Sequence, residues 1–373
     1  MKIGYVVDDT LDKPDGVQQY VLAVGEWMRS RGHDVHYITG QTVRTDIANI
    51  HSMSKNMRVI FNGNRLTVPF RAPKRAIRTL LDAQQFDVLH VQMPYSPLMA
   101  QRVLRAARQS VAKVGTFHIM PYSRSVFVLT RVLGWVLRPS LRQLRYVFAV
   151  SPAAQEFANC AFGVNAVVLG NGIDLQPFLQ AQPLPEYASK PTIAYLNRLV
   201  PRKGSQHLLA AVRALVQDMG YTKPFQVLVG GKGELSAELQ HYIDRHNLAD
   251  YVRLLGFVPE AIKPRFLASA DIVVYPSTGG ESFGIVLLEG MAASRGVVLA
   301  GNNPGYASVM HTLPDQLFDA NDIAAFAELL KTYLDDPALR KERVRPQREL
   351  AQQFDIGVIG AKLEDYYQKA QAK

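Results

Sequence analysis

The chain has 373 residues, of which 48% are hydrophobic and 20% charged, which supports a buried core and argues against intrinsic disorder. This length predicts about two domains. No apolar run reaches the roughly 18 residues that would predict a membrane-spanning helix. The start, MKIGYVV, is predicted to be a strand rather than a signal peptide, because Asp8 and Asp9 follow it directly. The single Cys160 excludes an internal disulfide and fits a reducing compartment.

The net charge of +10 is distributed unevenly along the chain. Residues 1–174 carry the whole excess, whereas residues 175–373 contain equal numbers of basic and acidic side chains. No acidic residue occurs from Val88 to Gln155. Such a one-sided field favours an anionic partner for the first half, namely nucleic acid, an acidic ligand or a lipid surface. The alternative is that the charge serves solubility alone.

Apolar runs alternate with helical periodicity along the whole chain. A first strand at 2–7 is followed by a helix at 16–31, in which Val17, Tyr20 and Val24 recur at helical spacing. Further strands are predicted at 34–39, 86–92, 112–118, 145–151, 166–172, 191–199, 225–231, 251–258, 271–277 and 296–301. Apolar strands separated by helices predict an α/β protein whose parallel sheets are buried on both faces in doubly wound, Rossmann-like domains.

The alternation breaks once, where three prolines and several polar residues follow Gln176. We therefore predict a first domain at 1–176, a linker at 177–190 and a second domain at 191–354. Ligands of such sheets bind at the carboxyl ends of the strands, and here also in a cleft between the domains.

The segment 275–296, YPSTGGESFGIVLLEGMAASRG, is the most informative part of the sequence. Its glycines allow close approach of the backbone. The amides of Phe283, Gly284 and Ile285 are expected to point out of a helix N-terminus, which favours a diphosphate.

Glu281 precedes this helix, and Glu289 lies about 7–8 Å further along its axis. Each carboxylate can accept two hydrogen bonds from a vicinal diol, so one can hold a sugar and the other a ribose. The alternative is that Glu281 caps the helix and Glu289 is solvated.

Other nucleotide, hydrolase and metal motifs are missing, including GxxxxGK[ST], GxSxG, HExxH and the EF-hand loop. The glycine-rich VGGKGE at 229–234 is a weak signal on its own. Asp8 and Asp9 are expected in a turn rather than as metal ligands. The sequence therefore predicts no metal site.

The Glu motif resembles the ExxxxxxxE signature of the retaining glycosyltransferases of family 4, which have the GT-B fold, two Rossmann-like domains facing each other across a cleft. NRLVPRKG resembles the family segment whose Arg198 and Lys203 hold the donor diphosphate. LVGGKGE and LLGFV match the strand ends near the nucleotide. The implied donor-binding residues are Gly16, Arg198, Lys203, Gly231, Val258, Glu281, Ser282, Phe283, Gly284, Ile285 and Glu289.

Family landmarks also occur in the first domain. PDGVQQYV resembles the Gly-Gly turn that opens the first helix, with Asp15 in place of the first glycine. GTFH carries the active-site His118, and the final segment 355–373 resembles the helix that crosses back to the first domain. The resemblance implies acceptor binding by Asp15, Gln18, Tyr20 and His118, and catalysis by His118, Glu281, Arg198 and Lys203. Arg198 and Lys203 would neutralise the leaving group, so no metal ion or cofactor is required, although Mg²⁺ is compatible.

Within the family, three features resemble the enzymes that mannosylate phosphatidylinositol. These are Gln18, the long basic and apolar segment after His118, and the basic run Arg71, Lys74, Arg75 and Arg78, which is expected to dock on an anionic membrane. Phe70, Ile77, Leu80, Phe127, Leu133, Trp135 and Leu137 either insert at this interface or are buried.

The implied function is transfer of mannose from GDP-mannose to an anionic lipid such as phosphatidylinositol, by an enzyme peripheral to the inner face of the cell membrane. One alternative uses a UDP-sugar and acts on diacylglycerol or a polyisoprenyl-linked acceptor. A second is a catalytically silent sugar-nucleotide-binding scaffold. A nucleic-acid-binding protein is disfavoured because no such motif occurs. The sequence leaves the oligomeric state open.

Overall fold

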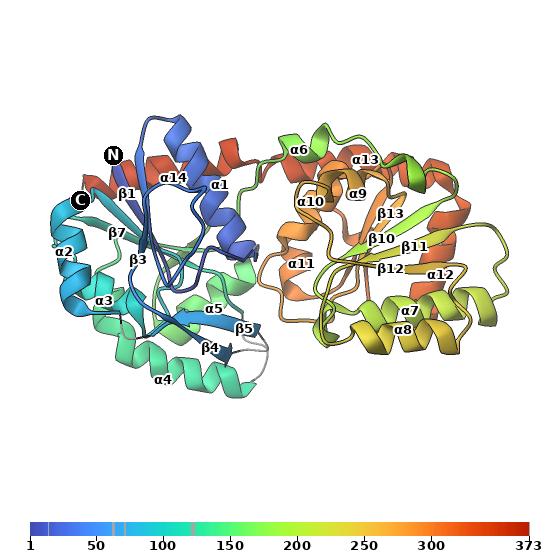
Figure 1. Ribbon diagram of the computed structural model, residues 1–373, viewed down its shortest axis with the longest axis horizontal. Coiled ribbons are helices and arrows are strands. Elements are labelled where there is room, and N and C mark those ends of the chain that lie inside the picture. The colour runs from blue at the N-terminus through green and yellow to red at the C-terminus, as the bar shows by residue number, and fades with distance from the viewer. Residues whose placement is uncertain (14, 62–63, 71, 121–123, 373) are drawn as a thin grey trace. The chain divides into compact units, whose positions relative to one another are not determined.

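The computed structural model describes residues 1–13, 15–61, 64–70, 72–120 and 124–372 (Figure 1). The chain forms two compact units. The first comprises Met1–Ile173 and Asp355–Lys373, and the second comprises Asp174–Phe354. Each unit is built around its own parallel sheet with helices packed against it, as the alternating apolar pattern predicts. The predicted α/β, doubly wound class is thereby confirmed.

The sheet of the first unit has the strand order β3-β2-β1-β6-β7-β8-β9, and all neighbours are parallel. Its strands are β1 (Lys2–Val7), β2 (Asp34–Thr39), β3 (Ile50–Ser52), β6 (Val88–Val91), β7 (Ala112–Phe117), β8 (Tyr146–Ala149) and β9 (Ala166–Val168). The helices are α1 (Gly16–Ser30), α2 (Lys74–Gln84), α3 (Met99–Ala106), α4 (Arg124–Leu141), α5 (Pro152–Phe162) and α14 (Ile356–Gln371). A separate antiparallel hairpin is formed by β4 (Asn56–Phe61) and β5 (Asn64–Pro69).

The sheet of the second unit has the order β12-β11-β10-β13-β14-β15, again parallel. Its strands are β10 (Thr192–Leu196), β11 (Gln226–Gly230), β12 (Val252–Gly256), β13 (Ile272–Tyr275), β14 (Val297–Gly301) and β15 (Leu317–Phe318). The helices are α6 (Gln176–Leu179), α7 (Ser205–Arg213), α8 (Ser236–Arg245), α9 (Lys263–Ala268), α10 (Ile285–Ala293), α11 (Pro304–Val309), α12 (Ile323–Asp335) and α13 (Pro337–Gln352).

Every strand predicted from the sequence is present. The strands at 2–7 and 34–39 have the predicted bounds, and the others are shortened at one or both ends. β3, β15 and the β4–β5 hairpin were missed. β3 and β15 are too short to show a pattern, and the hairpin is a separate sheet outside the strand-helix alternation. The segment 177–190 differs from the predicted linker, because most of α6 and a 3₁₀ turn at Pro185–Tyr187 lie in it and α6 packs on α9 and α10.

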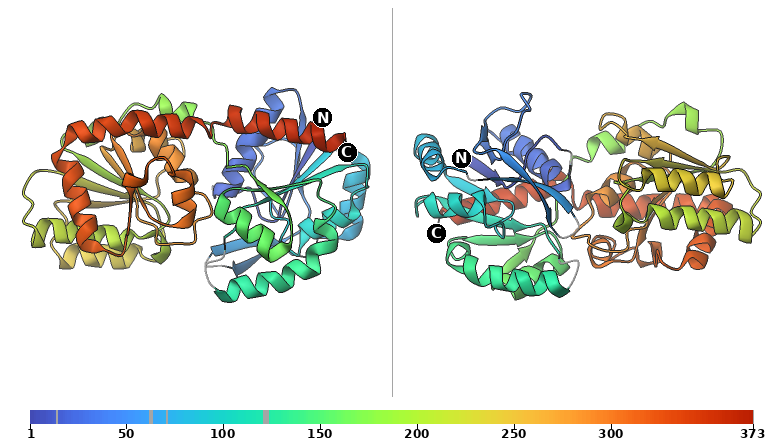
Figure 2. Two further views of the ribbon diagram at one scale, coloured as in Figure 1. Left: turned by 180° about the vertical axis from the view of Figure 1, so that it is seen from behind. Right: turned by 60° about the horizontal axis from the view of Figure 1, so that its bottom comes forward.

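The C-terminal helix α14 belongs to the first unit and packs against α1 (Figure 2). The backbone N–H of Ile356 donates to the carbonyl of Ile173 over 2.8 Å. At the other end of the helix, the hydroxyl of Tyr367 lies 2.6 Å from Nδ1 of the buried His90. Figure 2 shows both chain ends at the same side of this unit.

Helix α4 approaches α5 closely through a glycine. A Cβ atom at Gly134 would overlap the backbone oxygen of Ala161. Leu137 and Leu141 are buried on the same side of α4, so this side faces the core. No helix among the described residues is both long and apolar enough to cross a bilayer.

We predict that Gly134→Ala destabilises the first unit by about 1–3 kcal/mol, because the added methyl pushes α4 away from α5. Alanine at an ordinary helix position would instead be stabilising. The measurement is the urea midpoint of the unfolding transition. Val132→Ala, on the exposed side of α4, is the control and should change stability by less than about 0.5 kcal/mol. Equal midpoints for the two variants would contradict the close contact.

Candidate active site

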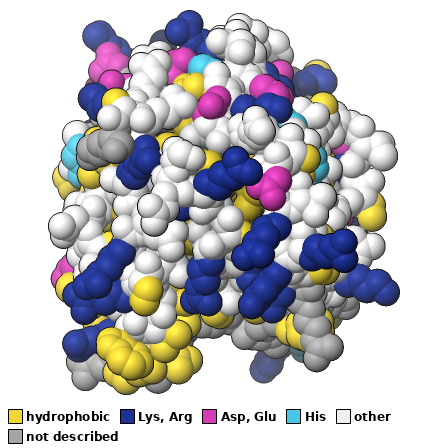
Figure 3. Space-filling model, turned by 90° about the vertical axis from the view of Figure 1, so that its left-hand side faces the viewer, with side chains coloured by type: hydrophobic (Ala, Val, Ile, Leu, Met, Phe, Trp, Pro, Cys, Tyr) yellow, Lys and Arg dark blue, Asp and Glu magenta, His cyan; other side chains and the backbone are white. Residues whose placement is uncertain are grey.

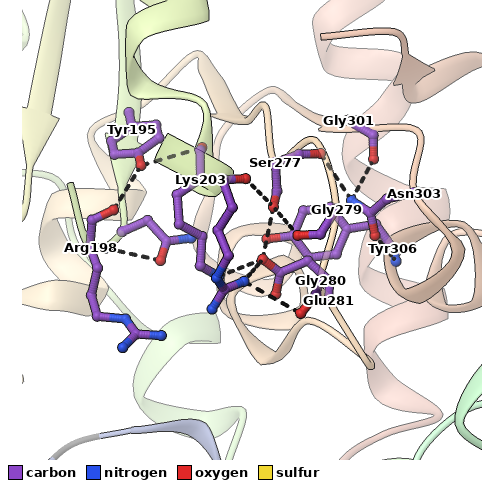
Figure 4. A network of polar contacts seen from close by, with 12 residues as sticks. Tyr195, Arg198, Lys203, Ser277, Gly279, Gly280, Glu281, Gly301, Asn303 and Tyr306 are labelled. Carbon is purple, nitrogen blue, oxygen red and sulfur yellow. Dashed lines mark hydrogen bonds and ion pairs between the residues drawn. The ribbon is translucent and has the colours of Figure 1, made fainter. Parts of the chain in front are cut away.

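The loop that follows β10 is fixed between two strands of the second unit. The buried hydroxyl of Tyr195 donates to the carbonyl oxygens of Arg198, over 3.3 Å, and of Lys203, over 3.4 Å (Figure 4). Gly204 ends the loop at φ 74°, and a Cβ there would overlap the backbone oxygen of Pro276, which follows β13. The loop can therefore lie against the end of β13 only because residue 204 is glycine.

A buried carboxylate joins this loop to the residues after β13. Oε1 of Glu281 lies 2.7 Å from Nζ of Lys203 and 2.9 Å from Nη1 of Arg202, and it accepts a hydrogen bond from Oγ of Ser277 over 2.8 Å (Figure 4). We call Lys203, Arg202, Ser277 and Glu281 the Glu281 cluster. Lys203 and Glu281 are both less than 9% exposed. The two predicted residues are thus brought together, and Arg202 and Ser277 were missed.

Burial and charge act in opposite directions on this cluster. Burial alone would raise the pKa of Glu281, but the charges of Lys203 and Arg202 outweigh it and bring the pKa below its usual range. Burial lowers the pKa of Lys203 to about 8, against the opposing attraction of Glu281. At neutral pH the carboxylate is therefore ionised and the ammonium is still mostly protonated.

Arg198 does not belong to the cluster. Its side chain is exposed, and Figure 4 shows its guanidinium extending away from Glu281. Its backbone N–H is held by the side-chain oxygen of Asn197 over 3.0 Å. The structure thus places Arg198 on the same loop as Lys203, with its charged end directed away from Glu281.

The helix α10 begins as the sequence predicts, directly after the Glu motif. Its N-cap is Gly284 at φ 112°, and a Cβ there would lie 2.6 Å from the ring of Tyr306. Phe283 is buried against Phe354, with ring centroids 5.3 Å apart. Ser282 and Gly284 are partly exposed. Glu281 makes no capping bond to this helix, because its carboxylate is taken by the cluster.

Glu289 is buried rather than solvated. Its Oε1 lies 2.6 Å from Nζ of Lys263 in α9, and the same ammonium lies 2.7 Å from Glu260. Burial raises the pKa of Glu289 in spite of this cation. Lys263 was missed from the sequence, since nothing in a sequence pattern pairs α9 with α10.

The remaining predicted donor residues lie at the same edge of the second sheet. Gly231 follows β11 at φ 135°, where a Cβ would overlap the carbonyl oxygen of Asn197. Its N–H donates to Gly256 over 2.7 Å. Val258 follows β12 and is partly exposed. The carboxyl ends of neighbouring parallel strands are where such sheets bind ligands.

In the first unit, His118 follows the carboxyl end of β7. Its Nε2 lies 2.9 Å from Oε1 of Gln92, which follows β6 and is fully buried. The ring of Tyr20 in α1 lies 5.6 Å away, centroid to centroid. Burial lowers the pKa of His118 to about 3, so the imidazole is neutral at physiological pH. Gln92 was missed, although it stands at the end of a predicted strand.

The start of α1 carries the other predicted acceptor residues. Asp15 is the N-cap of the helix but makes no side-chain capping bond, and Gly16 is the exposed first residue. Gln18 is buried, and its Nε2 donates to the carbonyl of Thr10 over 3.2 Å. Asp8 accepts from the backbone N–H of Ala100 over 2.8 Å.

The predicted membrane-docking side chains lie on α2. Lys74, Arg75 and Arg78 are exposed, whereas Ile77 is buried. Arg71 lies outside the described residues. Among the residues that the structure describes, no three His, Cys, Asp or Glu side chains are grouped to hold a metal ion.

Two family models match the two halves of the chain. Residues 14–177 match the family described as Glycosyltransferase Family 4, and residues 179–350 match the one described as Glycosyl transferases group 1. The chain is 31% identical to the phosphatidyl-myo-inositol mannosyltransferase of Mycolicibacterium smegmatis over 99% of this chain and 94% of that protein. It is 32% identical to the protein of that name from Mycobacterium tuberculosis H37Rv, over 99% and 97% of the two chains.

Solved structures share the fold at lower identity. Anabaena HepE in complex with UDP-glucose superposes with a TM-score of 0.77 at 19% identity, over 99% of this chain and 100% of that chain. A glycosyltransferase from Rickettsia africae gives a TM-score of 0.77 at 18% identity, over 99% and 98%. The matched segments together span both units. This protein therefore belongs to the glycosyltransferases of family 4 and has the GT-B fold.

Proposed function

We propose that this glycosyltransferase moves mannose from GDP-mannose to phosphatidylinositol, or a closely related anionic lipid, with retention at the anomeric carbon. Full-length similarity to two enzymes named for this acceptor supports the lipid and the sugar. The single structural observation that carries the chemistry is the Glu281 cluster at the carboxyl end of the second sheet.

We propose that the donor diphosphate binds at the loop after β10. Lys203, Arg202 and Arg198 supply three positive charges on one short loop. The N-terminus of α10, which begins after Gly284, adds the positive end of a helix dipole. We propose that these groups, rather than a resident metal ion or cofactor, neutralise the departing phosphate. Glu281 is ionised and can accept hydrogen bonds from sugar hydroxyls once the diphosphate shares its cations.

In the reaction, the bond from the anomeric carbon to the phosphate oxygen breaks and a bond to the acceptor oxygen forms on the same face. The proton of the acceptor hydroxyl passes to the departing phosphate. His118 stays neutral because of its low pKa, so we assign it to orienting the reacting hydroxyl, with Gln92 holding the ring. Gln18 and Tyr20 lie in the first turns of α1, and we assign both to the acceptor side of the site.

The lipid acceptor requires contact with a membrane surface. The first unit carries the whole positive excess of the chain, and Lys74, Arg75 and Arg78 are exposed on α2. Each such cation contributes about 1 kcal/mol near an anionic leaflet. We propose peripheral association of this unit with the cytoplasmic face of the cell membrane.

The proposed donor and acceptor are tested with a panel of nucleotide sugars. Purified enzyme is incubated with phosphatidylinositol dispersed in detergent, and the lipid product is identified by mass spectrometry. We expect GDP-mannose to add one hexose, with a kcat/KM at least about 100-fold above that for UDP-glucose. Diacylglycerol in place of phosphatidylinositol is the control acceptor. Transfer from UDP-glucose in the absence of transfer from GDP-mannose would overturn the proposal.

The role of Lys203 predicts a pH dependence. Its ammonium is protonated below a pKa of about 8, so the charge that faces the diphosphate is present at neutral pH and is lost as the pH rises. The kcat/KM for GDP-mannose should therefore fall between about pH 7 and about pH 9.

Lys203→Gln is the matched variant for this profile. It should be about 100-fold less active at neutral pH and show no further fall toward alkaline pH. Glu349→Gln, which removes an exposed ion pair with Arg345, is the control and should keep the profile of the wild type. A wild-type rate that stays constant over this range would contradict the assignment of Lys203.

A further inference from the structure

We propose that helix α4 is a second membrane contact, which inserts an apolar stripe into the interfacial region of an anionic bilayer. This inference rests on the proposed lipid acceptor and deepens it by naming the element that enters the membrane. The stripe consists of Val128, Leu129, Val132, Trp135 and Val136, each at least 52% exposed. Trp135 is 76% exposed, which is unusual for the largest apolar side chain of a folded domain.

The stripe is continuous on one side of the helix. At about 100° per residue, its five members occupy an arc of about 120°. The opposite side holds Leu137 and Leu141, which are buried, and Gly134, which approaches α5. Helix α4 thus has two apolar sides, whereas a surface helix ordinarily turns polar residues outward. Leu137, one of the side chains considered for insertion, is excluded by its burial.

Basic residues border the stripe. Arg131 and Arg138 are exposed at one edge of the arc, and Arg142 follows the end of the helix. No acidic residue occurs in α4 or anywhere between Val88 and Gln155. In Figure 3 a group of hydrophobic side chains gathers at the lower edge, and Lys and Arg side chains are spread over the face above it.

This charge pattern indicates whether the stripe contacts a second copy of the chain or a membrane. A second copy of the chain would bring two basic surfaces together, which costs free energy. An apolar helix face flanked by Arg, with Trp exposed, is the combination that lies in the plane of an anionic bilayer. Since no described helix can span a membrane, α4 is expected to lie along the surface.

The position of α4 in the chain connects it to the acceptor site. It is the first helix after His118 and starts at Arg124, so the two are at most about 20 Å apart along the chain. Insertion of α4 would therefore hold the His118 end of the first sheet near the lipid headgroups, where the acceptor hydroxyl lies. The basic helix α2 supplies attraction to the same leaflet without inserting, because its exposed face is charged.

Tryptophan fluorescence tests insertion directly. The chain has two tryptophans, Trp27 and Trp135, so Trp27→Phe leaves Trp135 as the only indole. Vesicles of phosphatidylcholine with phosphatidylglycerol should shift its emission to shorter wavelength, and brominated acyl chains should quench it. Trp135→Phe, which leaves Trp27, should show neither effect. Unchanged emission from Trp135 in the presence of bound vesicles would overturn the proposal.

Vesicle binding and sugar transfer by substituted variants provide a second test, which distinguishes loss of membrane contact from misfolding and from failure of the proposed function. The double variant Val132→Ser with Trp135→Ser should bind the vesicles at least about tenfold more weakly. Val358→Ser, at an exposed apolar position of α14, should bind like the wild type. Sugar transfer by the double variant should fall further with phosphatidylinositol in vesicles than with phosphatidylinositol in detergent.

The outcomes separate the two proposals. If the wild type transfers sugar to no lipid, the proposed function fails, while the fluorescence result still decides the role of α4. If transfer occurs but the double variant binds vesicles normally, the role of α4 fails alone. A dimer in the absence of vesicles that the double variant abolishes would assign the stripe to self-association instead.

Discussion

The second unit depends on one buried carboxylate. Removing an ionised glutamate from water costs several kcal/mol unless its charge is matched, and Glu281 is matched by Lys203 and Arg202 from the loop after β10. Ser277, at the end of β13, donates to the same oxygen. The cluster therefore ties two strand ends together, and Gly204 permits the approach by having no Cβ. Loss of Glu281 would leave the buried ammonium of Lys203 without its counter-charge.

The same cluster explains how a unit with almost no net charge can receive a diphosphate. Residues 174–354 contain 18 basic and 19 acidic side chains, but three of the cations occur within six residues, from Arg198 to Lys203. Glu281 neutralises part of this charge until a donor arrives. The first unit is different, because its excess is spread over exposed helices and no acidic residue interrupts it from Val88 to Gln155. Positive charge concentrated on one loop is suited to binding a small anion such as a diphosphate. Positive charge spread over several helices is suited to binding an anionic membrane surface.

The sequence predicted the fold well because apolar strands buried on both faces are visible as continuous runs, from β1 to β14. It also singled out Lys203 and Glu281, each within its own short motif, and the structure brings the two side chains together. It missed Arg202, Gln92 and the pairing of Lys263 with Glu289, because these contacts join separate elements and leave no periodic signal. The sequence also did not predict which apolar side of α4 is exposed. The close contact between Gly134 and α5 decides which side faces the core, and this contact is visible only in the structure.

We propose separate roles for the two residues, in which Lys203 binds the diphosphate and Glu281 binds the sugar. Isothermal titration of GDP and of GDP-mannose against the wild type, Lys203→Gln and Glu281→Gln separates the two roles. Lys203→Gln should weaken both ligands by a similar factor of at least about ten. Glu281→Gln should weaken GDP-mannose by about tenfold and leave the affinity for GDP unchanged or higher. An equal loss of affinity for both ligands in Glu281→Gln would contradict the account, because Glu281 would then only support the loop.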